Sequence, residues 1–174
     1  GIWESYFENG EINTKGRFVE GKMSGKWEVF YADGSRKTQT DYLNGVKNGT
    51  EILYDENGSI YQKADYKDGV MNGRWERYVE GILIEKGAYV EGKKDGLWVF
   101  YAQNGYKQRE QEFKKGKPDG RWVEYFSANK KSAEGEYNEG QKSGTWMNYD
   151  KKGNVLSETV FKNGKKIKEE IKKK

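Results

Sequence analysis

One stretch of the sequence decides the fold: Gly135-Glu-Tyr137-Asn-Glu-Gly140-Gln-Lys-Ser-Gly144-Thr-Trp146-Met-Asn-Tyr149. Its glycines and aromatic residues recur along the chain at a nearly constant spacing of 24 residues. A fixed spacing of this length is the signature of a repeat architecture. We therefore expect a tandem array over residues 1–164, followed by a basic tail over residues 165–174. The seven units begin at Gly1, Gly25, Gly49, Gly73, Gly96, Gly120 and Gly144.

The units share a template, in which offsets are counted from zero at the starting glycine. All 23 glycines fall on four offsets, namely zero, nine, fifteen and twenty. Offset five always holds Tyr or Phe. Unit four is one residue short before Gly81, and Asn129 replaces glycine at offset nine of unit six. Offset two holds Trp3, Trp27, Glu51, Trp75, Trp98, Trp122 and Trp146, and offset seventeen holds Phe18, Tyr42, Tyr66, Tyr89, Phe113, Tyr137 and Phe161.

Each unit reads as a β-hairpin. The dipeptides Asn9-Gly10 and Asp33-Gly34, at offsets eight and nine, predict a two-residue type I′ turn. Asn129 fits there because Asn also adopts the left-handed conformation. The flanking segments are too short for stable helices and are rich in aromatic and β-branched residues. The expected fold is therefore all-β, an elongated, open-ended, single-layer antiparallel β-meander of seven hairpins.

Pairing across the first turn places offset two opposite offset fifteen, where Gly16 and Gly135 are examples of small residues. A tryptophan can then lie over bare backbone. A second turn at offsets twenty-one and twenty-two would place offset seventeen opposite the next tryptophan, which gives a continuous ladder of rings on one face. The tyrosines at offset five have the opposite parity. Either a bulge brings them to the tryptophan face or they form a second ladder behind the sheet.

Composition supports aromatic packing and excludes much chemistry. Apolar residues make up 33% of the chain and charged residues 34%, yet 15% is aromatic, so ring packing replaces an aliphatic core. There is no His and no Cys. We expect no enzyme activity, cofactor or metal site, and the motifs Gly16–Lys22 and Gly87–Lys93, which look like phosphate loops, are explained by the template. Residues 1–164 carry 26 basic and 26 acidic side chains, which gives no support to nucleic-acid binding.

The phrase G-x-Y-x-x-G-x-x-x-G-x-W-x-x-Y, seen at residues 135–149, resembles the MORN repeat (membrane occupation and recognition nexus). The Trp-rich form of 24 residues is most similar to its bacterial branch, which is called antitoxin-like or exported. The resemblance implies an elongated antiparallel sheet for protein or lipid contact, without transferable catalytic residues. It also implies an exported bacterial protein, and a chain that starts at Gly1 fits removal of a signal peptide.

We expect a non-enzymatic scaffold that binds another protein. The alternatives are a membrane-surface adaptor for acidic phospholipids and a carbohydrate-binding module. Three aromatic residues at offset six, Phe7, Tyr31 and Phe126, lie outside the template and either extend the ring ladder or act as exposed anchors for a partner. The tail at 165–174, with Ile167 and Ile171 four residues apart, reads as a frayed end or a helical turn with weak affinity for acidic lipid.

Overall fold

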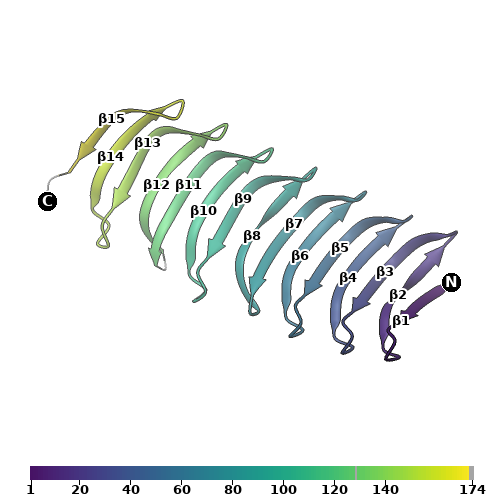
Figure 1. The fold of residues 1–174 in the computed structure, drawn as a ribbon. Coiled ribbons are helices and arrows are strands. Elements are labelled where there is room, and N and C mark those ends of the chain that lie inside the picture. Colours follow the sequence, from purple (N-terminus) through teal and green to yellow (C-terminus); the bar gives the residue numbers. More distant parts are fainter. Residues whose placement is uncertain (128, 173–174) are drawn as a thin grey trace. The chain divides into compact units, whose positions relative to one another are not determined.

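The computed structural model describes residues 1–127 and 129–172, and within them the chain forms fifteen strands and no helix. The strands follow one another in sequence order as hydrogen-bonded neighbours in one open antiparallel sheet (Figure 1). The predicted all-β meander is thus confirmed. The strands are β1 (Ile2–Tyr6), β2 (Ile12–Val19), β3 (Lys22–Phe30), β4 (Arg36–Leu43), β5 (Val46–Tyr54), β6 (Ile60–Lys67), β7 (Val70–Val79), β8 (Ile82–Val90), β9 (Lys93–Tyr101), β10 (Lys107–Lys114), β11 (Lys117–Ser127), β12 (Lys130–Asn138), β13 (Gln141–Tyr149), β14 (Val155–Lys162) and β15 (Lys165–Ile171).

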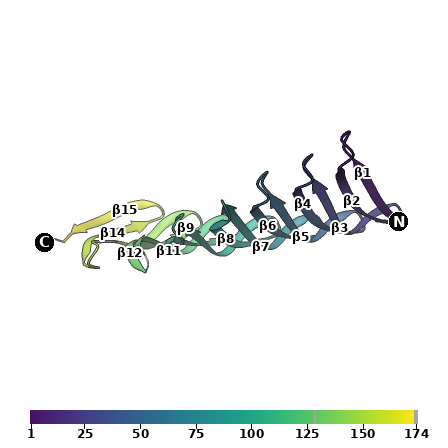
Figure 2. The ribbon, with the colours of Figure 1, turned by 90° about the horizontal axis from the view of Figure 1, so that it is seen from below.

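The chain divides into two compact units, which are described separately. The N-terminal unit comprises Gly1–Leu83 and Tyr89–Gly92, and the C-terminal unit comprises Ile84–Ala88 and Lys93–Lys174. Strand β8 contributes residues to both. In the N-terminal unit, Figure 2 shows the hairpins bending, so that the turns after β1, β3 and β5 stand to one side of the strands.

The first turn of each repeat unit was predicted to contain two residues, and in the first repeat it is longer. The Phe7 N–H donates to the Glu11 carbonyl at 2.8 Å, which leaves three residues in the loop, and Gly10 has φ +88°. This is a type I turn followed by one left-handed residue, not a type I′ turn. Asn9 has no positive φ; its carboxamide oxygen accepts the Glu11 N–H instead. The Asn-Gly pair therefore acts through a side-chain hydrogen bond and one glycine.

A bulge on the second strand compensates for the extra turn residue. Tyr6 pairs with Ile12 but Ser5 pairs with Thr14, which leaves Asn13 without a cross-strand partner. The two one-residue shifts cancel, so Trp3 lies opposite Gly16 as predicted. The same shift precedes the aromatic residue at offset five in other hairpins, at Phe30, Tyr54, Tyr125 and Tyr149.

The type I′ turn lies between successive repeat units. Val19 pairs with Lys22, and the two residues between them, Glu20 and Gly21, have φ +50° and +75°. The predicted position at offsets twenty-one and twenty-two was wrong by two residues. The same two-residue turn contains Asn44-Gly45, Asp68-Gly69, Lys115-Gly116, Glu139-Gly140 and Asn163-Gly164, each with positive φ at both residues.

Two expected irregularities are present. The short unit four closes its hairpin with Glu80 and Gly81 alone, at φ +51° and +77°, between β7 and β8. Asn129 has φ +63°, which confirms that it takes the left-handed role of the missing glycine.

Residues 165–171 form neither a frayed end nor a helical turn. They form β15, which pairs antiparallel with β14 from Lys162↔Lys165 to Ser157↔Ile171. Every residue of β15 is exposed. The strand is therefore held by backbone pairing. Because side chains alternate along a strand, Ile167 and Ile171 lie on the same face of β15 and do not form a helical stripe.

Candidate interaction surfaces

The tryptophan face carries the predicted ladder of rings. Phe18 lies edge-on to both Trp3 and Trp27, with centroids at 6.2 and 5.0 Å. Edge-to-face pairs of this kind stabilise beyond simple burial by about 0.5–1.5 kcal/mol each. Further ring contacts of offset two with offset seventeen are Trp27–Tyr42, Trp75–Tyr89, Trp98–Phe113, Tyr137–Trp146 and Trp146–Phe161.

The pairing behind this ladder differs from the prediction. Offset seventeen pairs near the turn, as in Tyr66↔Met71, and a two-residue shift follows. The next tryptophan therefore lies opposite offset fifteen, as in Ala64↔Trp75. The residue at offset fifteen thus faces offset two of its own unit and of the next, and its size decides how the two units meet.

Where offset fifteen is glycine, the next tryptophan lies directly on the backbone. A Cβ built on Gly16 would lie 2.1 Å from Trp27 Cδ2. The Trp27 Nε1–H donates to the Arg17 carbonyl at 3.2 Å, and the ring is only 5% exposed. We call these contacts glycine junctions, and they comprise Gly16 with Trp27, Gly87 with Trp98, and Gly135 with Trp146.

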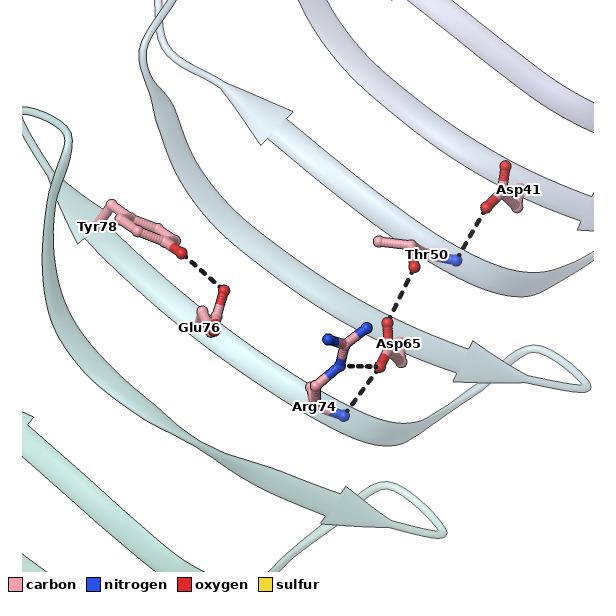
Figure 3. A network of polar contacts seen from close by, with 6 residues as sticks. All are labelled: Asp41, Thr50, Asp65, Arg74, Glu76 and Tyr78. Atoms are coloured by element: carbon pink, nitrogen blue, oxygen red, sulfur yellow. Dashed lines mark hydrogen bonds and ion pairs between the residues drawn. The ribbon is translucent and has the colours of Figure 1, made fainter.

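Where offset fifteen is larger, a carboxylate at offset sixteen lies over the starting glycine of the next unit, on the face opposite the tryptophans. Asp65 accepts the Arg74 backbone N–H at 3.1 Å, and it also accepts the Thr50 hydroxyl at 3.0 Å (Figure 3). A Cβ on Gly73 would lie 2.9 Å from Asp65 Cβ. We call these contacts carboxylate junctions, and they comprise Asp41 over Gly49, Asp65 over Gly73, and Glu112 over Gly120.

The starting glycine adopts a different conformation in each class. In the glycine junctions Gly25, Gly96 and Gly144 have φ +72°, +73° and +64°. In the carboxylate junctions Gly49, Gly73 and Gly120 have φ +119°, +124° and +100°. The second range is open to glycine alone, because a Cβ would clash with the backbone there.

Glu51, which breaks the tryptophan column, is buried with partners of its own. It is 7% exposed, Lys47 pairs with its carboxylate, and the Thr40 hydroxyl donates to Oε1 at 3.3 Å. Burial and the Glu51 carboxylate raise the pKa of Tyr66 to about 12. On β15 the same set recurs, because Glu169 pairs with Lys166 and accepts from Thr159.

The reverse face carries the second ladder, which settles the position of the offset-five tyrosines. The Tyr149 hydroxyl contacts Met147 Sδ at 3.3 Å and donates to Glu134 at 2.5 Å. Residues two apart share a face of a strand and adjacent residues do not, so Tyr149 and Met147 lie on the face opposite Trp146. The bulge does not turn the tyrosine over, because its extra residue is on the partner strand.

Two of these tyrosines, Tyr125 and Tyr149, share a carboxylate with a lysine. The Tyr125 hydroxyl donates to Glu110 at 2.8 Å, and Lys107 Nζ lies 2.6 Å from the same carboxylate. Partial burial opposes ionisation of Glu110, but these two hydrogen bonds outweigh it and lower its pKa. Burial and the Glu110 hydrogen bond raise the pKa of Tyr125 to about 12. Glu110 pairs in register with the buried residues Val99 and Val123.

The three aromatic residues singled out at offset six lie in different surroundings. Phe7 is half-buried beside the first turn. Tyr31 is half-buried, donates its hydroxyl to the Tyr54 carbonyl at 3.0 Å and has Lys37 over its ring at 5.3 Å. Phe126, near the end of β11, is 44% exposed. Of the three, Phe126 is therefore the most exposed and the best placed to contact a partner.

The two compact units differ in charge. The N-terminal unit has 11 basic and 15 acidic side chains, a net charge of −4, whereas the C-terminal unit has 21 basic and 13 acidic, a net charge of +8. The whole-chain value of +4 conceals this division, which the sequence shows only once the boundary is known. In the C-terminal unit, four lysines line an open groove of about 330 Å³ beside Tyr149; they are Lys130, Lys131, Lys151 and Lys152.

The type I′ turns differ in the same way. In the N-terminal unit five of the seven residues that flank these turns are exposed aliphatic residues and the other two are Lys22 and Lys67, whereas the equivalent positions of the C-terminal unit carry polar or basic side chains. The exposed aliphatic residues are Val19, Leu43, Val46, Val70 and Val90, at 42, 52, 45, 46 and 49% exposure. We call these five residues the aliphatic row. Sequence analysis overlooked them, although they occupy only offsets eighteen and twenty-one.

In residues 1–127 and 129–172, no three acidic side chains gather closely enough to bind a metal ion. A helix long and apolar enough to cross a membrane is likewise absent from the part of the chain that the structure describes.

Three segments of the chain match the family model of the MORN repeat variant, at residues 1–20, 47–68 and 142–163. Each coincides with a hairpin closed by a three-residue turn, namely β1–β2, β5–β6 and β13–β14. The matches support a MORN repeat protein. MORN repeats are commonly protein- or membrane-binding repeats, and the family is not one of enzymes. No curated protein matches the chain.

Proposed function

We propose that this chain is a non-enzymatic scaffold that binds another protein along its MORN sheet. The observation that carries the proposal is the repeated, pre-positioned side-chain array of both faces. Exposed rings such as Trp3 and hydroxyls such as that of Tyr125 are already fixed by contacts within the sheet. A partner that docks on them therefore loses little side-chain entropy on binding. Half-exposed aromatic residues are also favoured anchors at protein interfaces.

Within this proposal Phe126 is the exposed anchor of the C-terminal unit, and Phe7 and Tyr31 contribute their exposed edges in the N-terminal unit. The bacterial, exported and antitoxin-like branch belongs to the same proposal. It rests on the Trp-rich unit of 24 residues.

Photo-crosslinking tests protein binding. A photoreactive amino acid at position 126 should crosslink to one protein in the native host, and unlabelled chain should compete with that crosslink. The same amino acid in place of Trp98, which is 0% exposed, serves as the buried control and should give no crosslink. Far-UV circular dichroism shows that both variants keep the sheet, and equal labelling from two folded variants would count against the proposal.

A membrane-surface adaptor is the second candidate, because the net charge of +8 on the C-terminal unit would attract acidic headgroups. Flotation with phosphatidylcholine vesicles, with and without phosphatidylserine, distinguishes the two. The chain and a variant that ends at Gly164 are compared. Under the scaffold proposal neither variant floats at about 0.5 M salt, where surface charges are screened within a few ångströms. If the truncated variant still floats at that salt concentration, the result overturns the scaffold proposal and supports the membrane-surface adaptor.

A further inference from the structure

The aliphatic row lies on neighbouring, overlapping turns. The Gly69 N–H donates to the Lys47 carbonyl at 2.8 Å, and the Gly92 N–H donates to the Met71 carbonyl at 2.9 Å. A Cβ on Gly92 would lie 3.3 Å from Val70 Cγ1, so each valine lies beneath the next turn. These contacts bring Val46 and Val70 against the turns that follow them and hold the backbone of the row in place.

Folding of the turns does not require these aliphatic residues. The same two offsets carry Lys114 and Lys117 around one turn of the C-terminal unit, and Asn138 and Gln141 around another. Those turns keep the same pairing and the same positive φ values. Scattered exposed aliphatic residues need no explanation, but here they hold five of the seven equivalent positions of one unit, with Lys22 and Lys67 at the other two.

Acidic residues border the row. The first residue of three of its four turns is Glu20, Asp68 or Glu91, within a unit of net charge −4. Between two of these turns lies a groove of about 440 Å³, lined by Lys67, Asp68, Val70, Asn72, Val90 and Glu91. The groove thus combines two apolar side chains with two carboxylates and one lysine, Lys67.

The spacing of the turns selects the conformation of a bound segment. Successive turns are two strands apart, or about 9.6 Å. An extended polyproline II segment repeats its side-chain direction every three residues, or about 9.3 Å. A heptad of an α-helix spans about 10.5 Å and falls out of step sooner.

We propose that the aliphatic row binds an extended segment of a partner protein with an aliphatic residue at every third position and Lys or Arg between. The proposal rests on the scaffold function and names the site and chemistry of the partner. The aliphatic residues of the segment lie along Val19, Leu43, Val46, Val70 and Val90, and its basic residues meet Glu20, Asp68 and Glu91.

Fluorescence anisotropy with labelled peptides tests it on the full chain. The probe contains four Leu-Lys-Lys units, and its two controls replace Leu by Ser or Lys by Glu. The probe should bind at least tenfold more tightly than either control. The variant Leu43→Ser/Val46→Ser/Val70→Ser should bind the probe about tenfold more weakly. The variant Asp68→Asn/Glu91→Gln should lose the electrostatic part of the affinity, which added salt also removes from the native chain. The matched variant Lys117→Ser/Asn138→Ser/Gln141→Ser, at the same offsets of the C-terminal unit, should bind the probe as the native chain does.

Equal binding of the probe and its Ser control, or full affinity in the triple-serine variant, overturns the proposal. Far-UV circular dichroism of each variant shows that the sheet is intact, which the polar residues at these offsets in the C-terminal unit lead us to expect. Failure here leaves the scaffold function standing if the crosslink from position 126 persists, so the two proposals fail separately.

Discussion

The glycine junction at Gly16 and the carboxylate junction at Gly73 join successive hairpins with the same strand register but with different contacts. At Gly16 the Trp27 ring covers the backbone and its N–H finds a carbonyl. At Gly73 the Asp65 carboxylate covers the backbone and accepts an N–H. The comparison shows that one side chain, at offset fifteen, decides whether the next tryptophan can reach the backbone.

Burial of the tryptophans follows the same division. Trp27, Trp98 and Trp146 in the glycine junctions are at most 6% exposed. Trp75 and Trp122, which follow Ala64 and Gln111, are only half-buried. Bare backbone therefore allows closer packing than a short side chain does, because dispersion contacts are lost quickly with distance.

The largest expected effect is the loss of a tryptophan from a glycine junction. Trp27→Ala should lower the free energy of unfolding by roughly 3–5 kcal/mol, because it removes a buried ring and leaves a cavity. Trp75→Ala, in the same compact unit, should cost clearly less. Urea unfolding followed by far-UV circular dichroism measures both. Equal losses would mean that the two junction classes do not differ energetically.

Alanine substitutions of glycine should show the intolerant position moving between the classes. Gly16→Ala should cost roughly 1–3 kcal/mol because its Cβ meets the Trp27 ring. Gly25→Ala, with open space around it and φ +72°, should cost only about 1 kcal/mol of backbone strain. In the carboxylate junction the starting glycine should be the sensitive one, since a Cβ on Gly49 would lie 2.7 Å from Asp41 Cβ. Thermal and urea unfolding give the order, and Gly25→Ala as costly as Gly49→Ala would contradict it.

Removing the carboxylate should matter in only one class. Asp65→Ala leaves the Arg74 N–H without its acceptor and should cost about 1–3 kcal/mol. Little of this comes from the Arg74 side chain, which is 82% exposed. Glu136 holds the same offset in a glycine junction, where its carbonyl accepts the Trp146 N–H, so Glu136→Ala should stay within about 0.5 kcal/mol of the native value. Hydrogen exchange of the Arg74 amide offers a direct readout.

The smallest effect concerns the reverse face, where the classes should not differ. Tyr125 and Tyr149 neighbour a carboxylate and a glycine junction respectively, and burial together with Glu110 or Glu134 raises the pKa of each to about 12. A tyrosine whose pKa is raised on folding stabilises the fold fully below its ordinary pKa of 10.0, and this contribution is lost as the pH rises towards 12.

Tyrosinate absorbance should therefore rise in two phases, and the late phase should accompany loss of structure. Glu110→Gln should lower the pKa of Tyr125, and Glu134→Gln should lower chiefly that of Tyr149, with a smaller decrease at Tyr125, whose pKa the Glu134 charge also raises. Unequal shifts would mean that the class of the neighbouring junction influences the tyrosine pKa across the sheet.

Particular residues show how far the sequence reached. The spacing of Trp3 and Gly16 gave the right pairing although the turn between them was wrong, because a longer turn and a bulge at Asn13 cancel. Any two such compensating shifts leave the spacing unchanged, so spacing cannot reveal them. The charge division and the aliphatic row were missed for another reason, because both depend on a boundary between compact units within β8. The one-residue deletion before Gly81 precedes that boundary, but a deletion alone does not indicate a difference in charge or surface.

The sequence by itself determined the seven-fold hairpin repeat, the ring ladder and the left-handed role of Asn129, because backbone conformation and side-chain alternation are local properties. Only the tertiary structure decided which turn is type I′, which face holds Tyr149, and that Gly16 lies beneath Trp27 whereas Gly73 lies beneath Asp65. Those outcomes depend on contacts between neighbouring strands, because each face of the sheet brings a different side chain over the backbone of the adjacent strand. Residue spacing along the chain does not show how closely such side chains approach that backbone.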